Sequence, residues 1–196
     1  MKERPIIFSG PMVRAILVGA KKQTRRVVNP QPHAVRDGLY GWKQVAGGGY
    51  EVVWNALQMS GSQALSEYCP YGKPGDQLWV RETHLVTAGG SVLYKADNPA
   101  LVNCRPSIHM ARQHSRITLE VAGVRVERLQ DISEPDMIAE GVDYLLEQRG
   151  EPLRIDYRRL AFFGLWDKIN GKRLAHGEYV NANPWVWAVE FRAVKA

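Results

Sequence analysis

Cysteine is scarce in this sequence: 196 residues contain only Cys69 and Cys104, which excludes a disulfide framework. No apolar run approaches the roughly 18 residues that a membrane helix needs. The first residues, MKERPIIFSG, lack the hydrophobic segment of a signal peptide. We therefore expect a cytoplasmic protein with reduced thiols and no membrane partner.

Acidic residues are missing from two long stretches. Residues 4–36 contain seven Lys or Arg and no Asp or Glu. Residues 98–119 also lack acids but contain Arg105, Arg112 and Arg116 with two histidines. If the two stretches meet in space, they form a positive surface suited to a polyanion, which favours a nucleic-acid partner. The alternative is a generally basic surface with a chance gap in acids.

Metal-ligand spacing is missing as well. Cys104, His109 and His114 follow one another at intervals of five residues, and Cys69 lies far away. This spacing matches no usual zinc pattern. We expect neither a metal nor another cofactor.

Short strand and helix signals are what the sequence does contain. Strands are expected at residues 4–9, 24–28, 77–83, 91–96, 116–129 and 185–194, and helices at about 10–18, 133–140 and 156–169. The alternation of the long strand breaks at Ala122-Gly123, which predicts a bulge. Lys21 and Thr24 are expected in the turn after the first helix. The pattern predicts an α+β fold, a small mixed β-barrel with a few short helices.

Residues 29–76 are rich in Gly, Pro and Ser, which predicts long loops with one hairpin around YEVVW. Trp42, Tyr50 and Trp54 in this region are candidates for stacking on an unpaired base.

Five segments in order resemble the ASCH domain family: ILVGAKKQTRR, PGDQLWVRE, the long strand, LQDISEPDMIAEG and WVWAVEF. GAKKQTRR matches the family signature G-x-K-x-x-T-x-R, and the chain is most similar to phage and prophage members. The resemblance implies a PUA-like β-barrel fold in a single domain over residues 1–196. Insertions are expected at about 36–68 and 83–115.

The same resemblance implies a site. The family includes a bacterial amidohydrolase that removes acetyl from N4-acetylcytidine, as well as members thought to bind RNA or described as nucleases. By resemblance the catalytic lysine, threonine and glutamate correspond to Lys21, Thr24 and Glu140. The position after the lysine is usually Thr in the family and is Lys22 here.

The residue types suit amide hydrolysis, which needs a nucleophile and a base. Thr24 offers a hydroxyl, and Lys21 could take its proton if burial or the neighbouring cations Lys22, Arg25 and Arg26 lowered its pKa. The alternative is an ordinary solvated basic turn.

Glu140 stands in the last turn of its expected helix, where the helix dipole disfavours a carboxylate. Such a carboxylate could be held by a cation, with Lys21 or Arg26 as the partner. The alternative is an exposed Glu at a frayed helix end.

Further ligand-binding candidates come from two places. Arg81 and Glu82 end a strand, and one of them must face inward in a closed barrel. The acid-free segment contributes a candidate phosphate-binding flap or an unspecialised loop: Ser107, His109, Arg112 and Arg116.

Three functions remain open from the sequence. The first is a domain that binds nucleic acid or a modified nucleoside and hydrolyses an N-acyl group of a pyrimidine such as N4-acetylcytidine. The second is a non-catalytic module that recognises an unpaired base, in single-stranded RNA in preference to DNA. The third is an RNA-cleaving nuclease.

Overall fold

The computed structural model describes residues 1–29, 31, 43–45, 49–51, 69–170 and 182–194. The strands are β1 (Glu3–Ile7), β2 (Gln23–Val27), β3 (Lys43–Val45), β4 (Gly49–Glu51), β5 (Gln77–Arg81), β6 (His84–Val86), β7 (Val92–Tyr94), β8 (Thr118–Arg128) and β9 (Trp185–Ala193). The α-helices are α1 (Gly10–Leu17), α3 (Glu134–Ala139), α4 (Val142–Glu147) and α5 (Ile155–Asn170). Three short 3₁₀ turns are η1 (Ser107–His109), η2 (Arg112–His114) and η3 (Leu129–Asp131).

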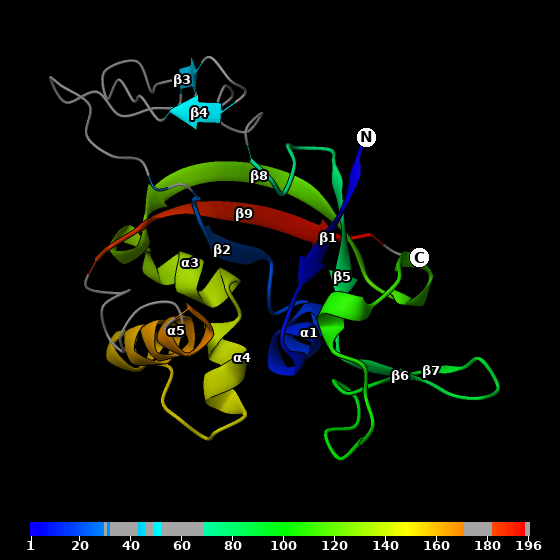
Figure 1. Cartoon of the computed structure of the whole chain (residues 1–196). Helices are drawn as coiled ribbons and strands as arrows, with labels where there is room; N and C mark the ends of the chain where they lie inside the picture. Colours follow the sequence, from blue (N-terminus) through cyan, green and yellow to red (C-terminus); the bar gives the residue numbers. More distant parts are fainter. Residues whose placement is uncertain (30, 32–42, 46–48, 52–68, 171–181, 195–196) are drawn as a thin grey trace, which may run out of the picture.

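Five strands form the central sheet in the order β1-β5-β8-β9-β2 (Figure 1). β1 runs parallel to β5, and the other neighbouring pairs are antiparallel. The expected bulge in β8 is confirmed by a register shift between Val121 and Gly123. Two small ribbons, β3-β4 and β6-β7, lie outside this sheet.

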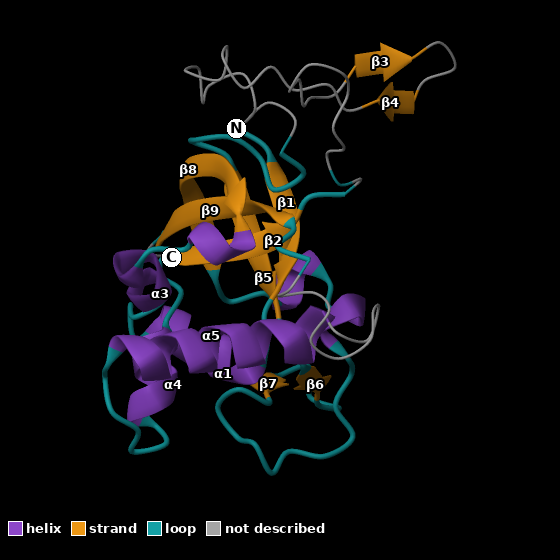
Figure 2. Cartoon of the chain, turned by 90° about the vertical axis from the view of Figure 1, so that its left-hand side faces the viewer, coloured by secondary structure: helices purple, strands orange, loops and turns teal. Residues whose placement is uncertain are grey.

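Helices α1, α4 and α5 gather on one side of the sheet (Figures 1 and 2). Val13 and Ile16 of α1 are buried in a core shared with sheet residues such as Leu119. A second core joins α3, α4 and α5, where Phe162 and Trp166 pack with Val186 of β9. Burial of these apolar faces, more than helix propensity, holds such short helices in place.

Most expected helix boundaries are confirmed. Pro11 stands in the first turn of α1, and Gly19 follows that helix with φ +75°. The Ser133 hydroxyl caps α3 by accepting from the Asp136 backbone N–H. The structure differs from the expectations at two points. Thr24 lies in β2 rather than in the turn after α1, and residues 142–147 form a helix, α4, that was not predicted.

These elements confirm the mixed α+β class. β1 and β2 are the outermost strands of the sheet. Closure of the sheet into a barrel through these two strands stays a prediction. The single domain over residues 1–196 also stays a prediction. The expected insertion at 36–68 falls mostly outside the described residues, whereas 83–115 contains β6, β7, η1 and η2. In the described part of the chain, no helix has both the length and the apolar character that crossing a bilayer requires.

Gly141 lets the end of α3 approach the turn after α1. Its φ is +84°, and a Cβ built there would lie 3.1 Å from the Cβ of Lys21 and 3.3 Å from the Cβ of Ala15. A larger residue would therefore meet both a backbone penalty and a steric one. This close approach brings Glu140 next to Lys21.

We predict that Gly141→Ala lowers the free energy of unfolding by about 2–4 kcal/mol, since left-handed backbone costs about 1–2 kcal/mol and overpacking adds to it. Gly150→Ala is the matched control, because Gly150 has φ +66° with open space around it. It should cost only the backbone penalty. Urea unfolding of both variants measures the difference, and equal losses would show that the contact with Lys21 and Ala15 is unimportant.

Candidate functional site

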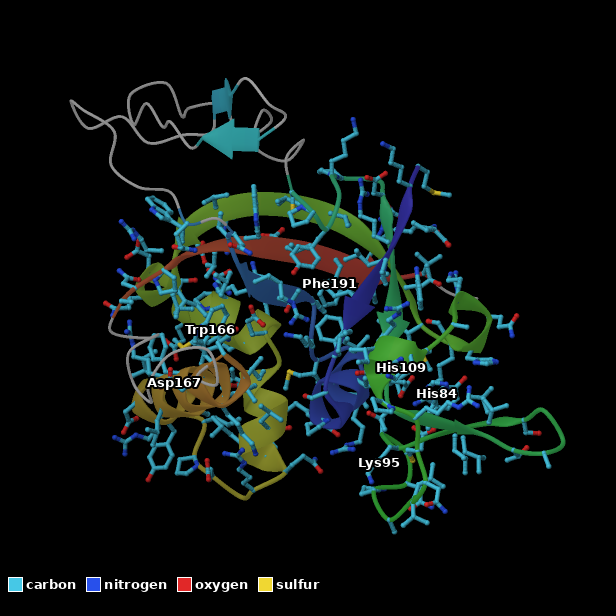
Figure 3. The ribbon with its side chains drawn as sticks, viewed as in Figure 1. His84, Lys95, His109, Trp166, Asp167 and Phe191 are labelled. Atoms are coloured by element: carbon cyan, nitrogen blue, oxygen red, sulfur yellow. The ribbon has the colours of Figure 1, made fainter. Side chains whose placement is uncertain are left out.

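A cavity of about 970 Å³ lies where the two sheet edges face α5. Ile7 and Phe8 line it from the β1 edge, and residues 24–27 line it from β2. α5 contributes five residues, of which Trp166 is labelled in Figure 3: Phe162, Leu165, Trp166, Ile169 and Asn170. Strands at a sheet edge carry backbone groups without strand partners, so the location suits ligand binding.

Lys21 is buried in the wall of this cavity, with an exposed fraction of 4%. Its ammonium donates to the Glu140 carboxylate at 2.6 Å, to the Glu140 backbone carbonyl at 2.9 Å and to the Gln23 backbone carbonyl at 2.7 Å. These three acceptors occupy all three hydrogens of the ammonium. Burial lowers the pKa of Lys21 from its usual value, while Glu140 opposes that effect.

Glu140 is the C-terminal cap of α3 and is also buried. One carboxylate oxygen accepts from Lys21, and the other accepts from Arg25 at 3.2 Å. The expectation that Glu140 is held by a cation is therefore confirmed for Lys21. The second cation is Arg25 rather than Arg26, because odd-numbered residues of β2 share the face that meets α3.

Arg25 also has a structural role, because its ion pairs join several elements. Its guanidinium is fully buried and lies within ion-pair distance of Glu127 and Asp136 as well as Glu140. A buried cation needs such pairing to offset its lost hydration. Arg25 therefore joins β2 to β8 and α3, although part of it also lines the cavity.

Thr24 and Arg26 complete the β2 side of the cavity. Thr24 is buried, with an exposed fraction of 4%. Arg26 is half-buried, donates from Nη2 to the Ile7 carbonyl at 2.6 Å, and lies over the Phe8 ring at 5.1 Å. Arg26 thus bridges the two sheet edges at the cavity.

Of the other predicted site residues, only Ser107 lines the cavity. Lys22 is exposed, and His109 is exposed on η1. Arg81 lies over Trp79, and Arg112 forms a surface pair with Glu3. Either Arg81 or Glu82 was expected to face inward, and Glu82 does so. It is buried in an ion pair with Arg116 and is not among the residues that line the cavity. Arg116 also binds Asp97, so Arg112 and Arg116 of the acid-free segment are each paired with a carboxylate.

Several lining residues were missed by the sequence analysis, including Phe8, Ser9, Tyr71 and Thr83. Phe8 and Ser9 link β1 to α1, a connection whose side chains carry no chemical signature. Trp166 of α5 was missed as well: it is buried in the second core and also lines the cavity. These residues come from loops and from α5, and only the tertiary fold brings them to one cavity.

The candidates for base stacking and for metal binding remain to be placed. Trp42, Trp54 and the side chain of Tyr50 lie outside the described residues. Among the residues that the structure describes, no three or more His, Cys, Asp or Glu side chains cluster so as to hold a metal ion.

Comparisons with known proteins give few matches. No protein-family model matches the chain, and no curated protein matches it. Among solved structures, the chain is similar to the crystal structure of an ASCH domain from Lactobacillus crispatus JV V101, with 11% identity and a TM-score of 0.39. That alignment covers 98% of this chain and 79% of the other. A likeness of this size carries no argument about fold or function.

We predict that Lys21→Met destabilises the protein by about 3–5 kcal/mol, because it breaks a buried ion pair and removes three hydrogen bonds. The double variant Lys21→Met/Glu140→Gln should lose less than the sum of the two single variants, as urea unfolding of all four proteins would measure. Arg154→Ala is the control: Arg154 pairs with Asp156 on the surface and should contribute about 0–1 kcal/mol. Additive losses at Lys21 and Glu140 would contradict a coupled pair.

Proposed function

We propose that the cavity binds one unpaired pyrimidine nucleoside, free or within single-stranded RNA, and that the chain is an ASCH-type domain. The observation that supports this is the meeting of Lys21, Thr24 and Glu140 in one cavity, although 119 residues separate the lysine from the glutamate. The cavity volume of about 970 Å³ is within the usual range for small-molecule sites.

The lining suits a nucleobase. Aromatic rings are present on several sides of the cavity, from Phe8, Tyr71, Phe162 and Trp166. The lining also includes the hydroxyl and amide groups of Ser9, Thr83 and Asn170. Stacking on aromatic rings requires a base whose faces are free, so the ligand is an unstacked nucleoside and not part of a duplex.

A second activity is favoured by the presence of Thr24 in the same cavity: hydrolysis of an N-acyl group such as that of N4-acetylcytidine. The lone pair of Lys21 is not free for Thr24, because the ammonium donates three hydrogen bonds. In this proposal Glu140 is the base and Lys21 the acid, in place of the expected Lys21 base, because each carboxylate oxygen has a lone pair beyond the one that accepts from Lys21 or Arg25.

With Glu140 as the base and Lys21 as the acid, every proton in the proposed reaction has a donor and an acceptor. Glu140 takes the proton of Thr24 as the hydroxyl oxygen bonds to the acyl carbon. Lys21 donates a proton to the base nitrogen as the C–N bond breaks, and the proton on Glu140 then returns to Lys21 across their 2.6 Å contact. Water then attacks the acyl carbon of the ester on Thr24 while Glu140 takes a proton from it. Glu140 returns this proton to the Thr24 oxygen as the C–O bond breaks, which restores the hydroxyl and releases the carboxylic acid.

We predict that the protein converts N4-acetylcytidine to cytidine, measured by chromatography of the nucleosides. Thr24→Val should lower kcat by about 10³-fold or more, because it removes the nucleophile while keeping the side-chain shape. Thr24→Ser is the matched control, since it retains a hydroxyl and should retain most of the activity.

Two outcomes would contradict hydrolysis. Unchanged N4-acetylcytidine at high protein concentration, with binding still detected by calorimetry, would leave a binding module. Equal turnover by wild type and Thr24→Val would remove Thr24 as the nucleophile. Shortened RNA in a preparation free of other ribonucleases would instead favour the nuclease alternative.

A further inference from the structure

The charges in the cavity wall do not balance. Lys21, Arg25 and Arg26 line the cavity, but Glu140 is the one carboxylate among the described lining residues. Lys21 and Arg25 share Glu140, and Arg25 also pairs with Glu127 and Asp136. Within the described ranges, Arg26 forms no ion pair with a carboxylate.

Arg26 is positioned without being neutralised. Its Nη2 donates to the Ile7 carbonyl, and its guanidinium lies over the Phe8 ring. The Nε of Arg26 is buried and has no hydrogen-bond partner among the described residues. Burial lowers the pKa of Arg26, with Tyr71 and Glu140 opposing that effect, so the guanidinium lacks much of its hydration. An anion at this point would restore the missing interaction.

A second buried donor in the same wall is unpaired. Trp166 is only 6% exposed, and its indole N–H has no partner in the part of the chain that the structure describes. A buried donor without an acceptor is costly. The wall is therefore short of acceptors as well as of negative charge, and both deficits would be met by a ligand rich in anionic oxygens.

The groups near α1 suit the same kind of ligand. Ser9 precedes α1 and lines the cavity, and its hydroxyl makes no capping hydrogen bond. The first turn of α1 favours negative charge through its dipole, and Thr83 and Ser107 add hydroxyl donors to the lining. An arginine fork with surrounding hydroxyl donors is a common way to bind phosphate.

We infer that Arg26 binds a phosphate group, so that the ligand of this cavity is a phosphorylated pyrimidine nucleotide or a nucleotide unit of a strand, rather than a free nucleoside. The inference rests on the proposed function, which supplies the nucleoside. Arg26 is then the residue that distinguishes a nucleotide from its nucleoside, while the Lys21–Glu140 pair and Thr24 face the base.

The experiment is calorimetric titration of wild type with cytidine, cytidine 5′-monophosphate, the dinucleotide CpC and inorganic phosphate at fixed ionic strength. We expect the monophosphate to bind about 10- to 100-fold more tightly than cytidine, the range of a hydrogen bond to a charged group. Arg26→Gln should reduce that ratio to about one while cytidine still binds, and Arg26→Lys should keep part of it. Lys22→Gln is the matched control, because it removes the same charge from an exposed neighbour outside the cavity wall and should leave the ratio unchanged.

Comparison of the affinities for the four ligands separates the possible results. An advantage of the monophosphate alone identifies a free nucleotide as the ligand, and one shared by CpC identifies a strand; both support the inference. Equal affinity of wild type for cytidine and its phosphorylated forms overturns the inference and leaves the proposed function standing. This comparison needs no variant to fold. If neither cytidine nor its phosphates bind, both are overturned, and binding of inorganic phosphate alone would also overturn the nucleotide assignment.

Discussion

The ammonium of Lys21 and the carboxylate of Glu140 form the contact on which the candidate site depends. Both groups are buried, so each offsets part of the hydration that the other has lost. Lys21 also binds the backbone carbonyls of Gln23 and Glu140, which attaches the start of β2 to the end of α3. One side chain thus links the sheet edge to the helical layer and brings a proton donor next to a proton acceptor.

The location of the cavity follows from the sheet. β1 and β2 are the outer strands, so their outward backbone groups and side chains are available to something other than a neighbouring strand. Arg26 uses one of these groups, the Ile7 carbonyl, and so lies across the gap between the two edges. α5 contributes the aromatic side chains of Phe162 and Trp166 to the same cavity, so that aromatic rings and the cations of β2 share its wall.

The distribution of charge in the folded protein differs from its distribution along the chain. Cations in the acid-free segments find acids from elsewhere: Arg112 pairs with Glu3, Arg116 with Glu82 and Asp97, and Arg25 with Glu127. Within the described residues, pairing of this kind offsets part of the positive charge that the sequence predicted, whereas Lys22 and Arg105 are exposed and form no ion pair with a carboxylate. In the cavity wall the cation without a carboxylate partner is Arg26, and a single cation there selects one group of a ligand.

By itself the sequence determined the local features: the start and end of α1, the positions of α3 and α5 and the bulge in β8. Each depends on neighbouring residues, whose spacing can be read directly. The sequence also offered Lys21, Thr24 and Glu140 as candidates, through resemblance to a family motif and through a carboxylate at an unfavourable helix end. Only the tertiary structure decided which cation holds Glu140, that Glu82 belongs to Arg116, and that Phe8, Tyr71 and Trp166 share one cavity wall. These contacts join residues from different elements, and their geometry is set by how the sheet edges pack against the helices.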